Sequence, residues 1–329
     1  MAPQATAVRL ADLQRPVGPQ LARVPDELRR IVSADSPLLE KVSGYLLRSQ
    51  GKLFRPTLLF LSNQASGAVD EHGLRLAAIV ELIHLATLVH DDSVDHSALR
   101  RGQPTVNALF SHQVSVIMGD YLFSRAIREL VAMDDVEPLR ILSHVTNEMS
   151  MGEMRQLAAY DAVQFTEEEY TVVIRAKTAS LFSAASELGA RRADATRRRA
   201  LRAYGDALGL AFQITDDLLD YTGGEAVTGK PSGLDLREHK ATLPLIAALP
   251  GLSASERRAV EALFAEKEPA DEDVARVIGL VRRSGGLEYS RERALECAGR
   301  AEAALEELPS SQARDALRDA VVYAVERRR

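Results

Sequence analysis

The chain has 329 residues, of which 46% are apolar and 27% are charged. This composition can fill one large hydrophobic core, and it excludes intrinsic disorder over most of the chain. The 41 basic and 47 acidic residues give a net charge of −6, which offers no basic surface for nucleic acid. The single cysteine, Cys297, excludes an intramolecular disulfide framework and is typical of a reducing compartment.

Helical periodicity of apolar residues dominates the sequence from about residue 31 onward. We expect residues 1–30 to form a flexible N-terminal arm, because Pro3, Pro16 and Pro19 interrupt any helix there. The helices expected after it span about 37–50, 56–66, 70–96, 113–133, 137–160, 167–189 and 194–221, and shorter polar helices follow the long loop at 223–244. Thr166–Glu169 and Ser253–Glu256 have the spacing of capping boxes. The sequence therefore predicts a single all-α domain over residues 31–329.

Nothing in the sequence predicts a membrane span or a secretory signal. No stretch reaches the roughly 18 to 20 uninterrupted apolar residues that a span needs. The most apolar stretch, residues 76–89, is interrupted by Glu81 and His84, and the N-terminus has no apolar signal segment. We expect a cytoplasmic protein with at most peripheral membrane contact.

Two clusters of aspartates share the spacing DDxxD on two of the expected helices, far apart in the sequence. Residues four apart lie on one face of a helix, so the outer carboxylates of each cluster project together. Anions on such apolar helices need a cation, and oxygen ligands suit Mg²⁺, which substrate phosphates usually complete. The pair therefore predicts a diphosphate held between two facing helices. The clusters are Asp91, Asp92 and Asp95, and Asp216, Asp217 and Asp220.

Basic residues near these helices could neutralise the rest of a diphosphate charge. Lys52 and Arg55 stand at a helix start, where backbone N–H groups also favour anions. The other candidates are Arg100, Arg101, Lys177, Lys230 and Lys240. A second group is expected to be ordinary solvated charge: Arg191, Arg192, Arg197, Arg198 and Arg199.

Between about residues 46 and 249 the sequence resembles the trans-isoprenyl diphosphate synthases, also called polyprenyl synthetases. The resemblance rests on seven strings in the family's order: GKLFRP, IHLATLVHDDSVD, RRGQPTVN, MGDYLF, RAKTASLF, FQITDDLLDYTG and GKPSGLDLREHKATLP. One departure is His239, where the family's loop often has glycine before the lysine.

The resemblance implies an all-α barrel of helices around a deep central cavity, in a homodimer. It implies that isopentenyl diphosphate binds to Lys52, Arg55, His84 and Arg101. It implies that an allylic diphosphate binds to Arg100, Lys177, Lys230 and Lys240, with Lys177, Thr178 and Gln213 as the catalytic residues. Three Mg²⁺ ions would be held by Asp91, Asp95 and Asp216, with Asp92, Asp217 and Asp220 in support. The allylic C–O bond would ionise, and the double bond of isopentenyl diphosphate would attack the cation inside an apolar cavity that excludes water.

The turns of helix that precede Asp91 predict the product length. In short-chain members of the family a bulky aromatic residue four or five positions before the first aspartate forms a floor. Those positions here are Thr87 and Ala86, with Ile83 and Leu82 a turn further away. We therefore predict a product longer than geranylgeranyl diphosphate, made from farnesyl or geranylgeranyl diphosphate, in the range used for quinone side chains. The sequence does not show where the floor of the cavity lies.

Several alternatives stay open at this point. Glu81 and His84 form an ExxH pair, but a di-iron site needs two such pairs. An HD-type phosphohydrolase, suggested by His90 and Asp91, would leave the second aspartate cluster unexplained. A class I terpene cyclase would not need isopentenyl diphosphate. A short-chain geranylgeranyl diphosphate synthase and one subunit of a hetero-oligomeric synthase also fit the motifs.

Overall fold

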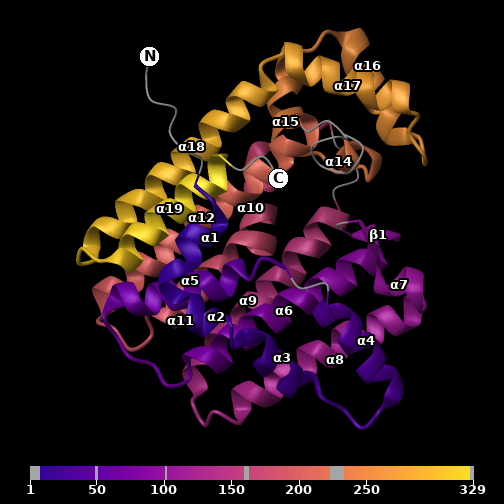
Figure 1. Cartoon of the computed structure of the whole chain (residues 1–329). Helices are drawn as coiled ribbons and strands as arrows, with labels where there is room; N and C mark the ends of the chain where they lie inside the picture. Colours follow the sequence, from indigo (N-terminus) through magenta and orange to yellow (C-terminus); the bar gives the residue numbers. More distant parts are fainter. Residues whose placement is uncertain (1–7, 49–50, 101, 159–162, 223–232, 327–329) are drawn as a thin grey trace.

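The computed structural model describes residues 8–48, 51–100, 102–158, 163–222 and 233–326, which fold almost entirely as helices (Figure 1). The first elements are α1 (Leu10–Gln14), η1 (Arg15–Val17), α2 (Gly18–Leu21), α3 (Val24–Val32), α4 (Pro37–Arg48), α5 (Phe54–Ser66), α6 (Gly73–Val94), α7 (Val106–Leu109), α8 (His112–Val131) and α9 (Val136–Leu157). The later elements are α10 (Glu167–Ile174), η2 (Arg175–Ala179), α11 (Ser180–Gly189), α12 (Ala195–Thr222), α14 (Leu234–Arg237), α15 (Leu243–Ala248), η3 (Leu249–Gly251), α16 (Ala254–Ala265), α17 (Asp271–Arg283), α18 (Gly286–Ala304), η4 (Leu305–Glu307) and α19 (Gln312–Glu326). Strands β1 (Leu99–Arg100) and β2 (Gln103–Pro104) pair antiparallel.

The all-α fold is confirmed, and the boundaries of the long helices differ from the expected ones by a few residues at each end. Both capping boxes form, with Thr166 and Ser253 as the N-caps of α10 and α16. Gly67 ends α5 in a left-handed conformation, φ 71°. The helix expected over residues 167–189 is continuous but contains one π turn, η2, and such turns often mark functional sites.

The expectation of a flexible arm over residues 1–30 is wrong for the part that the structure describes. Residues 10–30 form short helices, and Leu13, Leu28 and Ile31 are completely buried in the main core. Pro16, Pro19 and Pro25 occupy the first turns of η1, α2 and α3, where a missing N–H costs nothing, and Pro3 lies outside the described residues. They therefore begin helices instead of breaking them, and the arm is part of the domain.

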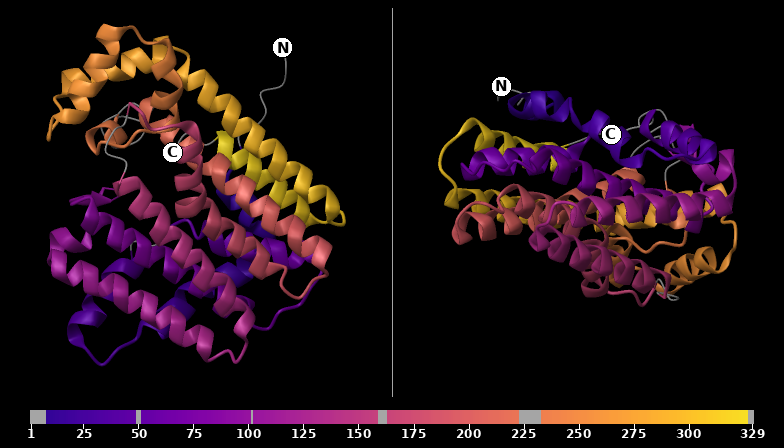
Figure 2. Two further views of the ribbon diagram at one scale, coloured as in Figure 1. Left: turned by 180° about the vertical axis from the view of Figure 1, so that it is seen from behind. Right: turned by 90° about the horizontal axis from the view of Figure 1, so that it is seen from below.

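Two long helices, α6 and α12, each pack against several neighbours. Helix α6 packs against α8, α5 and α3, whereas α12 packs against α18 and α11, and α11 in turn packs against α5. Figure 2 shows the indigo N-terminal helices as an outer layer on one side of this arrangement. Gly209 allows a close approach of α12 to η2, because a Cβ there would lie 2.5 Å from the Cα of Ala179.

Helix α6 is long and apolar enough, by length and mean hydropathy alone, to cross a membrane. Most of its apolar window, 61%, is nevertheless buried inside the protein. Burial of this kind is also what a core helix shows, so the helix's composition is explained by its central position.

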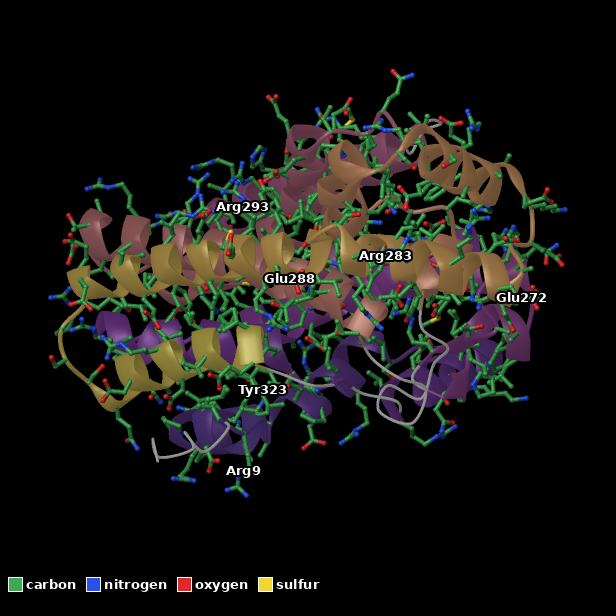
Figure 3. All side chains as sticks on the ribbon, turned by 90° about the horizontal axis from the view of Figure 1, so that it is seen from above. Arg9, Glu272, Arg283, Glu288, Arg293 and Tyr323 are labelled. Carbon is green, nitrogen blue, oxygen red and sulfur yellow. The ribbon has the colours of Figure 1, made fainter. Side chains whose placement is uncertain are left out.

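The C-terminal elements build a second, smaller core beside the end of α12. Leu236 of α14, Leu245 of α15, Val260 of α16 and Val277 of α17 are completely buried in it. In Figure 1 the hairpin of α16 and α17 lies over α14 and α15, away from the main core. In Figure 3 Tyr323 on α19 lies on the same side of α18 as Arg9, next to the N-terminal helices.

Candidate active site

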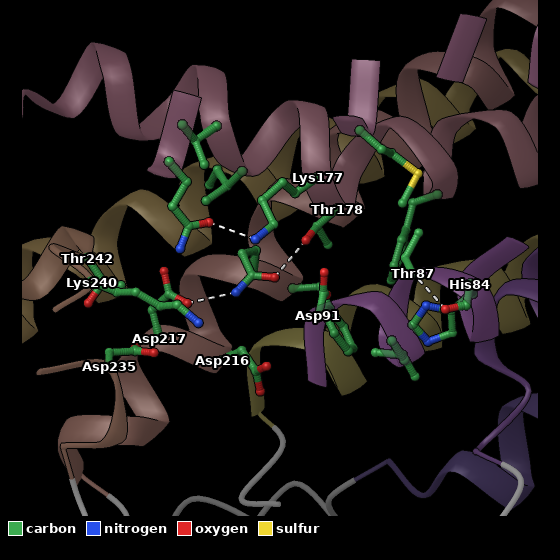
Figure 4. Close-up of a pocket in the computed structure, with 18 of the residues that line it drawn as sticks. His84, Thr87, Asp91, Lys177, Thr178, Asp216, Asp217, Asp235, Lys240 and Thr242 are labelled. Atoms are coloured by element: carbon green, nitrogen blue, oxygen red, sulfur yellow. Dashed lines mark hydrogen bonds between the residues drawn. The ribbon is translucent and has the colours of Figure 1, made fainter. Parts of the chain in front are cut away.

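A cavity of about 640 Å³ lies between α6 and α12 and receives residues of both aspartate clusters. Asp91 enters it from α6, and Asp216 and Asp217 enter it from α12 (Figure 4). An aromatic wall of Phe54 and Phe212, stacked with ring centroids 5.7 Å apart, closes another side. The two clusters therefore share one site, and the cavity combines anionic side chains with an apolar surface.

The three aspartates of the first cluster have different surroundings. Asp91 lines the cavity, and Asp92 is buried and accepts a hydrogen bond of 2.7 Å from Nε of Arg100. Asp95 accepts one of 3.0 Å from Nζ of Lys240. Lys240 comes from the segment after α14, so this ion pair joins the far loop to the end of α6.

The second cluster is held by hydrogen bonds from three directions. Asp217 accepts from the hydroxyl of Tyr170 at 2.6 Å and from Nε2 of Gln213 at 2.7 Å. Asp220 accepts from the backbone N–H groups of residues 234 and 235, both at 3.0 Å. Asp220 therefore anchors the start of α14, and Asp216 of this cluster faces the cavity.

Burial raises the pKa of the carboxyl groups in the cavity. It raises the pKa of Asp91 to about 6, although the charge of Lys177 opposes this shift. It raises the pKa of Asp217 to about 7 against the hydrogen bonds from Tyr170 and Gln213. It also raises the pKa of Asp235 well above its usual range, and the carboxylates of Asp217 and Asp220 add to this. A cation bound next to these carboxylates would stabilise their ionised forms and lower their raised pKa values.

The carboxylate oxygens in the cavity suit an Mg²⁺ ion whose remaining ligands come from a substrate. Among the described residues, no three Asp, Glu, His or Cys side chains already converge on one point that could hold a metal ion. Mg²⁺ usually takes one or two carboxylates from the protein and its other oxygens from water and phosphates. Asp91 and Asp216, on facing helices of one cavity, supply oxygens of this kind.

Most of the predicted cations line the same cavity. Lys177 donates a hydrogen bond of 2.7 Å to Oε1 of Gln156 and forms an ion pair with Glu153. Burial lowers the pKa of Lys240, but the charges of Asp95 and Glu238 outweigh it and raise that pKa. Five of the predicted cations line the cavity: Lys52, Arg55, Arg100, Lys177 and Lys240. Arg101 and Lys230 lie outside the described residues.

The comparisons with known proteins agree with this geometry. The family model described as "Polyprenyl synthetase" matches residues 36–281. The chain belongs to the polyprenyl synthetase family.

Similar proteins extend over nearly the whole chain. An all-trans-nonaprenyl-diphosphate synthase (geranyl-diphosphate specific) of Rhodobacter capsulatus is 39% identical over 96% of this chain and 97% of its own. An octaprenyl diphosphate synthase of Escherichia coli is 36% identical over 91% of this chain and 93% of its own. A crystal structure of a polyprenyl synthase from Caulobacter crescentus, complexed with calcium and isoprenyl diphosphate, superposes with a TM-score of 0.93 at 36% identity and covers 99% of this chain and 100% of its own.

Two of the residues that the resemblance assigns to catalysis, Thr178 and Gln213, are joined by a hydrogen bond in this polyprenyl synthetase. The hydroxyl of Thr178 donates 2.7 Å to Oε1 of Gln213, whose Nε2 donates to Asp217 (Figure 4). Lys177 and Thr178 lie in the π turn η2, which adds a residue to the turn and directs both side chains toward the cavity. The link from Thr178 to Asp217 fixes the face of α12 that lines the cavity.

The residues predicted to bind isopentenyl diphosphate surround the start of α5. Nζ of Lys52 lies 3.1 Å from the hydroxyl of Tyr323, and the guanidinium of Arg55 lies over the ring of Phe182, 4.7 Å from its centroid. His84 lines the same cavity from α6. The structure thus brings together the described members of this set.

The predicted chain-length pocket is only partly where it was expected. Thr87 lines the cavity, one turn of α6 below Asp91. Ala86, Ile83 and Leu82 are buried in the packed core of the protein and do not line the cavity. Successive helical residues point about 100° apart, so the neighbour of a cavity-facing residue can face the core. The wall of this cavity therefore does not include these three residues, and their part in setting the product length stays a prediction.

Several residues of the site escaped prediction from the sequence. Glu153 and Gln156 lie one turn apart on α9 beside Lys177, where polar residues on a half-exposed helix gave no local signal. Tyr170 gave no signal in the sequence of a role in the site, yet its hydroxyl donates a hydrogen bond to Asp217. Asp235 lies in the long loop, where a single aspartate could not be distinguished from a solvated one.

The interpretation of Arg191 as a solvated charge is wrong. Its side chain is fully buried and pairs with Asp70 and Asp135, with Nη2 2.9 Å from Oδ1 of Asp70. Arg198 is half-buried between Glu137 and Glu187. These groups bind together the ends of α6, α9, α11 and α12 that lie away from the aspartate clusters.

Proposed function

We propose that this polyprenyl synthetase condenses isopentenyl diphosphate repeatedly with an allylic diphosphate to give an all-trans polyprenyl diphosphate longer than geranylgeranyl diphosphate. The observation that carries the proposal is the shared cavity, in which both aspartate clusters face a wall of phenylalanines. The names of the relatives, which include octaprenyl and nonaprenyl diphosphate synthases, support the long product. Farnesyl or geranylgeranyl diphosphate is the proposed starter.

Asp91, Asp95 and Asp216 are the residues that would hold Mg²⁺, in three ions, with the other three aspartates in support. When bound, these ions supply positive charge that stabilises the departing diphosphate. Lys177, Lys240 and Arg100 provide fixed cations around the same space, as Lys230 would from outside the described residues. Their charges are in place before the reaction, so little reorganisation is needed as negative charge develops.

The second substrate, isopentenyl diphosphate, would bind next to the start of α5. Lys52, Arg55 and His84 line the cavity there, and Arg101 would join them from outside the described residues. Binding both diphosphates at fixed positions makes the attack of the double bond on the allylic carbon effectively intramolecular. The aromatic wall excludes water that would otherwise capture the cation. The departing diphosphate is the proposed acceptor of the proton.

A homodimer is the proposed assembly. A stripe of apolar side chains remains exposed on α8 and α9, and a large exposed apolar surface marks an interaction site. The stripe consists of Val116, Ile117, Ile127, Val131, Met151, Met154 and Leu157. Light scattering should give twice the mass of the chain, and Ile117→Asp should give the monomer mass.

A hetero-oligomeric assembly is a second candidate that one comparison favours. A relative from Geobacillus stearothermophilus, named heptaprenyl diphosphate synthase component 2, is 35% identical over 92% of this chain and 94% of its own. Activity of the purified chain alone would exclude the need for a second component.

We place the enzyme in the cytoplasm, with peripheral membrane contact through which a long product is released. Fractionation should recover it in the cytoplasm, with a minor part bound to membranes and released by high salt or detergent. Recovery only with the membrane fraction would contradict this location.

The function is tested by incubating the purified chain with farnesyl diphosphate, isopentenyl diphosphate and Mg²⁺. Mass spectrometry should show products with more than 20 carbon atoms. Products of 20 carbon atoms or fewer would identify a short-chain synthase, and cyclised products made without isopentenyl diphosphate would identify a terpene cyclase.

A further inference from the structure

Lys240 reaches the first aspartate cluster from a short segment, residues 233–242, part of which lines the cavity. Its Nζ lies 3.0 Å from Oδ2 of Asp95 and 2.8 Å from Oε2 of Glu238. Its backbone N–H donates a hydrogen bond of 2.7 Å to the carbonyl of Asp235. The position of this ammonium therefore depends on how the segment itself is fixed.

The other side of the segment is attached to the α16–α17 hairpin. Gly233 packs so closely on α17 that a Cβ there would lie 2.6 Å from Cγ1 of Val274. The guanidinium of Arg237 forms an ion pair of 2.7 Å with Asp271 at the start of α17. These two contacts fix the beginning and middle of the segment, but neither is adjacent to Lys240.

The contact adjacent to Lys240 is made by His239. Nε2 of this histidine lies 2.7 Å from the carbonyl oxygen of Glu266, to which it can donate a hydrogen bond, and its ring meets Phe264 of α16 edge-on. The backbone of His239 is left-handed, φ 57°, a conformation that side chains rarely adopt. The imidazole ring holds this left-handed turn of the backbone against the α16–α17 hairpin. The next residue, Lys240, is thereby directed toward Asp95.

We propose that His239 is a positioning residue that sets, through Lys240, the affinity of the site for the allylic diphosphate. The backbone conformation alone would be available to glycine, which often stands at this place in the family. The imidazole adds contacts with the α16–α17 hairpin, the hydrogen bond to Glu266 and the ring contact with Phe264, that glycine cannot make. This inference rests on the proposed function, in which Lys240 contacts the allylic diphosphate.

Three substitutions separate the effect of the side-chain contacts of His239 from the effect of its left-handed backbone. His239→Gly keeps the left-handed turn and removes the ring, and His239→Asn tolerates the turn but is too short to reach the carbonyl of Glu266. His239→Gln places an amide N–H near the position of Nε2 and can restore the hydrogen bond. We expect the Gly and Asn variants to bind farnesyl diphosphate about 10-fold more weakly, because small displacements of a binding group cost this much or more. The Gln variant should recover most of the affinity.

The deciding experiment is a double-mutant cycle with Lys240→Ala, measured by calorimetric binding of farnesyl diphosphate in the presence of Mg²⁺. If His239 acts through Lys240, His239→Gly should have no further effect once Lys240 is alanine. Additive losses in the double variant, or equal affinities of wild type and His239→Gly, would overturn the proposal. Because the cycle uses binding, its result is independent of the elongation assay, in which failure of the wild-type chain would instead refute the proposed function.

Discussion

The burial of Asp91 predicts that Asp91→Asn stabilises the protein without Mg²⁺ while it removes activity. Burial raises the pKa of this carboxyl from 3.8 to about 6, and each pKa unit corresponds to 1.36 kcal/mol. Keeping Asp91 charged in the folded protein therefore costs about 3 kcal/mol at pH 8. Asparagine has nearly the same shape and carries no charge, so it avoids this cost.

The sign of the effect fixes its pH dependence. Because the pKa of Asp91 is higher in the folded state, the contribution of this residue to stability decreases as pH rises from about 4 to about 6 and is then constant. The advantage of Asp91→Asn should be absent near pH 4 and reach its maximum above pH 6. Urea unfolding with EDTA at several pH values measures this difference.

A matched control is Asp95→Asn, because Asp95 is paired with Lys240 at 3.0 Å. Removing this carboxylate should destabilise the chain or leave it unchanged, whereas Asp91→Asn should stabilise it. Activity of Asp91→Asn should fall by more than about 100-fold, beyond the loss expected for residues that only support a metal ligand. An Asp91→Asn variant that is less stable than wild type above pH 6 would refute the assignment of a buried, unneutralised charge.

Three further outcomes follow from the site. Thr87→Phe should shorten the product, as measured by mass spectrometry, because Thr87 lines the cavity. Products of unchanged length would show that this position of α6 does not determine chain length. Ala86→Phe should instead lower the thermal midpoint, because Ala86 is packed in the core, where added volume costs about 1–3 kcal/mol; an unchanged midpoint would contradict this packing. Tyr170→Phe should lower kcat with little change in overall fold, because Asp217 loses a donor at 2.6 Å; full activity would exclude a role for that hydrogen bond.

Local patterns predicted the helices and the aspartate clusters because both depend on residues close in sequence. Spacing of four along a helix is enough to place Asp91 and Asp95 on one face. The facing of Asp91 and Asp216 depends on how α6 and α12 pack, and it could be anticipated only because both helices were strongly apolar. The resemblance supplied roles for Lys177, Thr178 and Gln213, and the structure links Thr178 and Gln213 to the second cluster.

The errors arose where partners are distant in the sequence. Arg191 stands in a run of arginines that looks solvated, and its partners Asp70 and Asp135 belong to other helix ends. Pro16, Pro19 and Pro25 would break a long helix but suit the first turns of short ones. Ala86 and Thr87 are neighbours in sequence, yet only tertiary packing shows which of them faces the cavity.

The central claim is that the two aspartate clusters hold one diphosphate jointly through Mg²⁺. The binding can be measured directly with a non-reactive analogue of farnesyl diphosphate in which sulfur replaces the oxygen between the prenyl chain and the diphosphate. Calorimetric titration with this analogue compares wild type, Asp91→Asn and Asp216→Asn. We predict tight binding to wild type only when Mg²⁺ is present, and a large loss of affinity in each variant. Mg²⁺-dependent binding of wild-type strength in either variant would show that one cluster suffices and would contradict the claim.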